Sequence, residues 1–373
     1  TYLFKEVFNV SMPTALTMIT VTTGVYLVMG GYKAAARIDF IQGTIMFFGA
    51  LSMVWFVFSY FAKDLGSYAA VVENAVNLYR GRLEGVVDPI QSTPIKPMPD
   101  WLFWSVVFMT SIAPWGLPQM VHKFYAIKDE KQIVKGAIVC CVFAALVGVA
   151  AYTIGSLSHL LPPEVLQTTL NADGTAIDFN KLVPTMLVKC LPSWFLAIVL
   201  LLVLSASTST LCSLALTSSA AISLDLVKGF VLPNASEKTH LTIFRICCAV
   251  FLVCSYFIAL FNPSWIVALT ALSWGAICGG FLAPYVYGLF WRGTTKCGAA
   301  AGMASGIIVA NAIYWGIFIC QGPAAAKSFS PVTASIAMVF PFLVVPIVSA
   351  TTKKLEPERV KRAFGDASDE ANS

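Results

Sequence analysis

The sequence predicts an all-α, polytopic membrane protein with about nine transmembrane helices. Of the 373 residues, 58% are hydrophobic and 12% are charged, and the mean hydropathy is +0.78. Soluble domains carry about a quarter charged residues. Apolar runs of about 20 residues recur along the chain, and lipid forces such runs into helices because every backbone hydrogen bond must be satisfied internally.

The expected spans lie at residues 8–30, 39–61, 102–124, 133–154, 194–221, 241–261, 264–290, 295–319 and 331–350. A polar helix at 66–83 and a proline-rich linker at 88–99 are expected between the second and third spans. Asp178 is expected to cap a short helix that stops before Pro192. The charged segment 356–373 is expected to be disordered.

The basic residues predict the orientation of the chain. Nine spans place the two ends on opposite sides, and sixteen of the 24 Lys and Arg residues fall on the side of the C-terminus. The positive-inside rule therefore predicts a cytoplasmic C-terminus. The net charge of +5 follows from this topology and does not indicate nucleic-acid binding. The ten cysteines and three histidines show no CxxC or Cys/His spacing, which disfavours a zinc or redox site.

The fifth span carries an unusual number of hydroxyl groups, at Ser205, Ser207, Thr208, Ser209 and Thr210. In a helix, the carbonyl oxygen of Ala206 lies level with the side chains of Ser209 and Thr210, so three hard oxygens converge. Carbonyl and hydroxyl oxygens are ligands for an alkali cation, and secondary transporters bind coupling ions in such helices. Alternatively, the hydroxyls bond back to their own helix or join neighbouring helices.

Two other spans have unusual backbone chemistry. In the third span, Pro114, Gly116 and Pro118 weaken the helix within one and a half turns. The resulting break either frees backbone groups to bind a solute or serves as a packing kink. In the seventh span three glycines surround Trp274, and close helix packing explains them as well as a binding site does.

Asp39 is the acidic residue at the start of the second span. It is expected either to cap that helix and pair with Arg37, or to lie on the path of a cation. The residues themselves leave both interpretations open.

Five motifs in order resemble the sodium/solute symporter family, most closely its proline and pantothenate permease branch. They are Gly30-Gly31-x-Lys33-Ala34 leading to Asp39-x-Ile41-Gln42-Gly43, Gly116-x-Pro118-Gln119, Val183-Pro184-Thr185, Ser209-Thr210, and Leu289-Phe290-Trp291-Arg292. In that family ten helices form two inverted five-helix repeats. The resemblance implies that this chain is the C-terminal part of such a fold, from an N-terminally truncated sequence.

The resemblance also implies site residues and boundaries. It assigns sodium binding to Ala206, Ser209 and Thr210, and a place on the cytoplasmic sodium path to Asp39. The implied solute contacts are Ser111, Trp115, Gly116, Pro118, Gln119 and Trp274. The implied domains are the end of the first repeat (1–62), an extracytoplasmic loop (63–100), the second repeat (101–292), two peripheral helices (293–350) and a cytoplasmic tail (351–373).

The predicted function is sodium-coupled uptake of a small polar organic solute across the cell membrane. The expected partners are the solute, Na⁺ and the lipid bilayer, without nucleic acid or an obligatory protein partner. Thr110 and Pro114 replace aromatic residues of proline permeases, which disfavours proline, whereas 112–123 is closer to the pantothenate type. The alternatives are a membrane solute sensor and a proton-coupled symporter. An enzyme is disfavoured because the spans hold no catalytic constellation.

Overall fold

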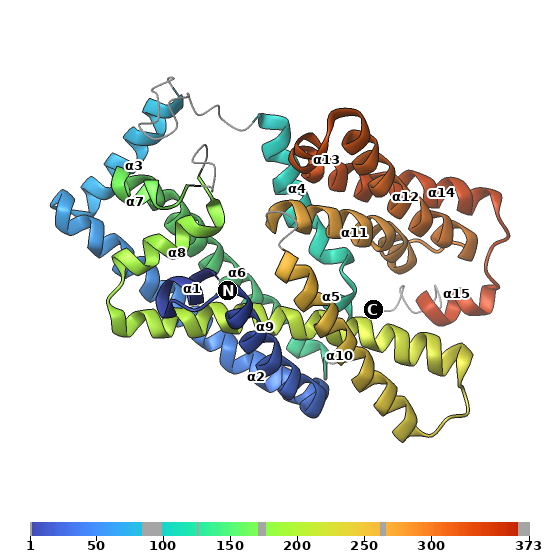
Figure 1. Ribbon diagram of the computed structural model, residues 1–373. Coiled ribbons are helices and arrows are strands. Elements are labelled where there is room, and N and C mark those ends of the chain that lie inside the picture. Colours follow the sequence, from blue (N-terminus) through green and yellow to red (C-terminus); the bar gives the residue numbers. More distant parts are fainter. Residues whose placement is uncertain (1, 84–98, 125–126, 171–176, 262–265, 365–373) are drawn as a thin grey trace. The chain divides into compact units, whose positions relative to one another are not determined.

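The computed structural model describes residues 2–83, 99–124, 127–170, 177–261 and 266–364, and these segments are almost entirely helical (Figure 1). Within them, seven helical segments are long and apolar enough to cross a membrane, and Met12–Val25 is apolar but shorter. The seven are Arg37–Leu65, Glu130–Leu160, Ser193–Val231, Glu237–Phe261, Leu269–Phe290, Lys296–Gln321 and Pro323–Thr351. The predicted all-α, multi-span class is confirmed.

The chain forms two compact units. The first comprises Thr1–Pro97 and Ile127–Pro263, and the second comprises Met98–Ala126 and Ser264–Ser373. The first unit contains α1 (Tyr2–Phe8), α2 (Met12–Leu65), α3 (Tyr68–Leu83), α6 (Glu130–Leu157), η1 (Ser158–Leu160), α7 (Pro163–Gln167), α8 (Phe179–Cys190), α9 (Ser193–Ala220), the π-helix η2 (Ala221–Val231) and α10 (Glu237–Phe261). The second contains α4 (Asp100–Gly116), α5 (Pro118–Phe124), α11 (Ile266–Phe290), α12 (Lys296–Gln321), α13 (Pro323–Val339), α14 (Pro341–Thr351) and α15 (Pro357–Phe364).

The prediction of separate spans at 8–30 and 39–61 is wrong, because α2 is one continuous helix of 54 residues. It begins at the Ser11 cap and ends at Gly66, whose φ of 83° is left-handed. At 1.5 Å per residue it is about 81 Å long, more than twice the ~30 Å hydrocarbon core. Asp39 therefore lies inside a helix and does not cap one.

The first unit is built around the packing of α2 against α9, with α6 and α10 also against α2. Its largest buried cluster includes Val57, Met186 and Val199, all at 0% exposure. The predicted short helix is present as α8, and the carboxylate of Asp178 accepts a hydrogen bond from the backbone N–H of Asn180 at 3.0 Å. The expected cap is thus confirmed, as is the polar helix α3; the linker at 88–99 lies outside the described residues except for Pro99.

In the second unit, α11 packs against α12 and α13 through small residues. A Cβ built on Gly275 would lie 3.0 Å from Ala334 Cα, and one on Gly279 would lie 2.9 Å from the Ala337 carbonyl oxygen. On the other side, Gly306 of α12 meets the backbone of Gly279. These glycines are required for close helix contact, which favours the packing interpretation of this segment.

The end of the chain is more ordered than its composition predicts. Residues Pro357–Phe364 form α15, so the expected disorder is wrong for them, and 365–373 lie outside the described residues. Val360 and Phe364 are both half-buried and fall on one side of the helix. The Arg292 guanidinium carbon lies 5.8 Å from the centre of the Phe364 ring, so a cation–π contact joins α15 to the turn before α12.

Candidate functional site

The hydroxyl cluster occupies more than one face of α9. Ser205 and Thr208 are buried, Ser207 and Thr210 are exposed, and Ser209 is half-buried. The Thr210 hydroxyl donates to the Ala206 carbonyl oxygen at 3.1 Å. Two of the three predicted sodium oxygens therefore meet, and Ser209 is the adjoining residue. These uncharged, hard oxygens suit Na⁺, although back-bonding of Thr210 to its own helix also satisfies its hydroxyl in a purely structural role.

The buried side of the cluster faces α2. Gln42 donates from Nε2 to the Thr208 hydroxyl oxygen at 3.1 Å, and Thr208 donates to the Leu204 carbonyl at 2.8 Å. Two turns further along α2, a Cβ on Gly49 would lie 2.6 Å from Leu202 Cδ1, so the helices are in close contact there. The site residues predicted from the sequence do not include Gln42. Its carboxamide inside an apolar span is the sequence feature that could have indicated it.

Asp39 lies on α2 three residues before Gln42 and is half-buried. Residues three apart share one helix face. The structure therefore places Asp39 on the same side of α2 as the residue that contacts the hydroxyl cluster. Its role on a cation path remains a prediction.

In the second unit, the third expected span is broken where the prolines and glycine predict. α4 ends at Gly116, Leu117 is extended with φ −79° and ψ 120°, and α5 begins at Pro118. Because proline has no N–H, Pro114 and Pro118 each remove a helix donor. The Cys278 thiol of α11 donates to the Ala113 carbonyl at 3.2 Å, so α11 satisfies a carbonyl beside the break.

The predicted solute residues share one unit but differ in exposure. Gly116 is buried against α11, where its Cβ would lie 2.9 Å from Leu282 Cβ. Trp274 packs against the cluster of α4, α11 and α13 that includes Ala113 and Leu117. Trp115 is 66% exposed and Ser111 is also exposed. Pro118 and Gln119 are half-buried. The structure thus brings Trp274 and the α4 break into one packed region and leaves the Trp115 ring uncovered within this unit.

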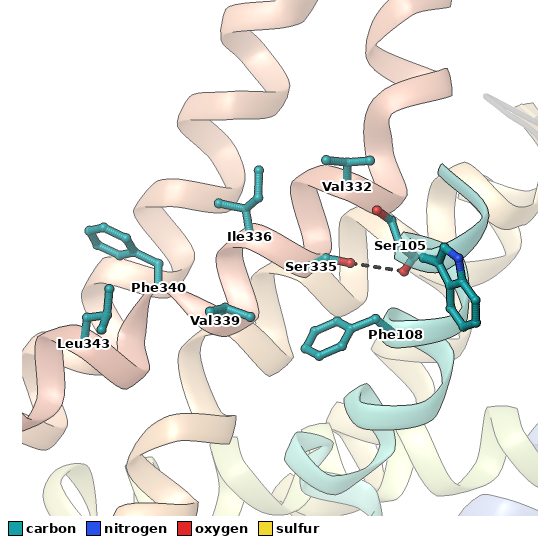
Figure 2. Close-up of a pocket in the computed structure, with 9 residues that line it drawn as sticks. Ser105, Phe108, Val332, Ser335, Ile336, Val339, Phe340 and Leu343 are labelled. Carbon is teal, nitrogen blue, oxygen red and sulfur yellow. Dashed lines mark hydrogen bonds between the residues drawn. The ribbon is translucent and has the colours of Figure 1, made fainter. Parts of the chain in front are cut away.

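Two grooves are lined mostly by apolar side chains. One, of about 500 Å³, lies between α4 and α13–α14, where the Ser335 hydroxyl donates to the Ser105 carbonyl at 3.1 Å (Figure 2). The other, of about 730 Å³, is lined by α2, α3 and α6. Neither groove includes a predicted solute residue.

Fold and site together define a polytopic helical membrane protein with a helix broken at Leu117 and a hydroxyl-rich helix, α9. The model of the sodium:solute symporter family matches residues 1–306, and the chain belongs to this family. It is 28% identical over 369 residues to the sodium/proline symporter of Haemophilus influenzae. It is 25% identical over 314 residues to the sodium/pantothenate symporter of the same organism. These matches support the predicted proline/pantothenate branch.

The chain covers only part of the length of these relatives. The proline symporter match spans 95% of this chain and 67% of the relative, and the pantothenate symporter match spans 82% and 59%. A solved structure of a Na⁺-coupled sialic acid symporter in a substrate-bound, outward-open state matches with a TM-score of 0.70 at 15% identity. That match covers 95% of this chain and 72% of the solved one, and it confirms the transporter fold.

Proposed function

We propose that this chain is part of a sodium-coupled importer of a small polar organic solute. The observation that carries the proposal is the meeting of the Ala206 carbonyl and Thr210 hydroxyl beside Ser209, on an apolar helix of a symporter-family chain. Sodium bound by these oxygens stabilises one state of the carrier, and the solute then binds that state more tightly. Coupling of this kind needs only a difference in affinity between states.

The proposed solute contacts are Ser111, Trp115, Gly116, Pro118, Gln119 and Trp274. The break at Leu117 supports this assignment because helix ends leave backbone N–H and C=O groups without helix partners. The exposed indole of Trp115 offers an apolar face with one hydrogen-bond donor. Such a site suits a small zwitterionic or anionic solute, for which pantothenate and proline are the first test compounds.

The proposed location is the cell membrane with a cytoplasmic C-terminus, supported by the uneven distribution of Lys and Arg. We also propose the repeat boundaries given by the family resemblance, with 101–292 as the second repeat.

The experiment is uptake of labelled pantothenate and proline by the complete protein in proteoliposomes. We expect uptake under an inward sodium gradient and little uptake when choline replaces sodium. Asp39→Asn tests the proton alternative: uptake driven by a pH gradient without sodium, and lost in this variant, contradicts sodium coupling.

A further inference from the structure

Gln42 lies at the contact between α2 and α9. Its amide nitrogen donates to the Thr208 hydroxyl at 3.1 Å. The single proton of that hydroxyl points to the carbonyls of its own helix, at 2.8 Å from Leu204 and 3.3 Å from Ser205. The Thr208 oxygen can therefore accept the hydrogen bond from Gln42 Nε2 while its own proton is donated to the Leu204 carbonyl. These two hydrogen bonds in series join α2 to α9.

The other end of the same carboxamide is unused. Gln42 Oε1 is buried and has no hydrogen-bond partner among the residues that the structure describes. A buried acceptor without a donor is costly, and most buried polar groups avoid it. A leucine would fill similar space without that cost, so packing alone does not explain a glutamine here.

The position of this link connects it to the candidate sodium site. Thr208 immediately precedes Ser209 and Thr210 on α9, and Asp39 lies three residues before Gln42 on α2. A bond to Thr208 fixes the rotation of α9 about its axis, and that rotation sets where the Ser209 and Thr210 hydroxyls point.

We propose that Gln42 is a positioning residue that ties sodium binding on α9 to the placement of α2; this inference rests on the proposed function. Its Nε2 holds Thr208 in one placement. Its unpaired Oε1 accepts a second hydrogen bond when α9 moves relative to α2 during transport, so the carboxamide has a contact in each of two states.

The test is a double-mutant cycle of Gln42→Leu and Thr208→Val in the complete protein. Each single variant is expected to raise the half-saturating sodium concentration about fivefold, the equivalent of one ordinary hydrogen bond. The double variant is expected to show no further rise. The solute KM at saturating sodium is expected to stay at the wild-type value, which separates sodium positioning from general damage.

Matched variants guard against misfolding. Thr208→Ser keeps the hydroxyl and is expected to keep the wild-type sodium response. Thr44→Val removes a hydroxyl on α2 that bonds to the Phe40 carbonyl of its own helix at 3.0 Å, and it is expected to change nothing.

A second readout is the rise in thermal unfolding midpoint of the purified protein on adding sodium, which Gln42→Leu is expected to reduce. If the wild type shows no sodium response in either assay, the proposed function fails and this inference fails with it. If the wild type responds but the Gln42 and Thr208 effects add, or are absent, only the role of Gln42 is refuted.

Discussion

The contact between α11 and α12 makes a sharp prediction for Gly306→Ala. A methyl group at Gly306 would overlap the carbonyl oxygen of Gly279 and lie 2.8 Å from the Gly280 nitrogen. These are backbone atoms, so no change of rotamer relieves the overlap and the two helices must separate. Gly316 on the same helix has nothing within 4 Å of its Cβ position, which makes Gly316→Ala the matched control.

The magnitude follows from comparing the two variants. Both gain the same helix propensity from alanine, about 1 kcal/mol, so that contribution cancels. The difference that remains is the overpacking cost at Gly306, about 1–3 kcal/mol. SDS titration of the protein in mixed micelles measures both free energies of unfolding. A Gly306→Ala variant as stable as Gly316→Ala would refute the close approach of α11 and α12.

Three further predictions concern other parts of the molecule. Asp178→Ala is expected to lower the free energy of unfolding by about 1 kcal/mol, because the α8 cap is lost. Asp178→Asn keeps a capping side chain and is expected to keep most of that stability; equal losses of stability in both variants would contradict a capping role. Burial raises the pKa of the Cys190 thiol to about 12. At pH 8, N-ethylmaleimide is therefore expected to modify the exposed Cys297 in the folded protein and to modify Cys190 only after SDS unfolds it. Equal rates of modification of the two cysteines in the folded protein would contradict this. Trp115→Ala is expected to raise the solute KM about two- to tenfold without changing the half-saturating sodium concentration, and an effect on sodium alone would remove Trp115 from the solute site.

The sequence predicts most helices because apolar runs and caps are local signals. The break at Leu117 follows from Pro114 and Pro118, and the start of α8 follows from Asp178. The continuity of α2 is not predicted, because the hydropathy pattern shows two separate apolar runs there. No proline lies between Pro13 and the end of α2, so nothing removes a helix donor.

The candidate site shows the same division between local and distant signals. The approach of the Thr210 hydroxyl to the Ala206 carbonyl follows from helix spacing alone. The Gln42–Thr208 hydrogen bond joins residues 166 positions apart and depends on the register of α2 against α9. One sequence does not contain that register, so the polar character of Gln42 is visible in the sequence but its partner Thr208 is known only from the packed structure.

Thr210→Ala tests directly whether Ala206, Ser209 and Thr210 bind the coupling sodium, as we propose. The control is Thr242→Ala, because the Thr242 hydroxyl likewise donates to a carbonyl of its own helix, that of Lys238 at 2.9 Å. The measurement is the sodium dependence of solute uptake by the complete protein in proteoliposomes. We expect a sharply raised sodium requirement in Thr210→Ala and the wild-type requirement in Thr242→Ala. An unchanged requirement in both variants would contradict sodium binding and leave the hydroxyl cluster a role in helix packing alone.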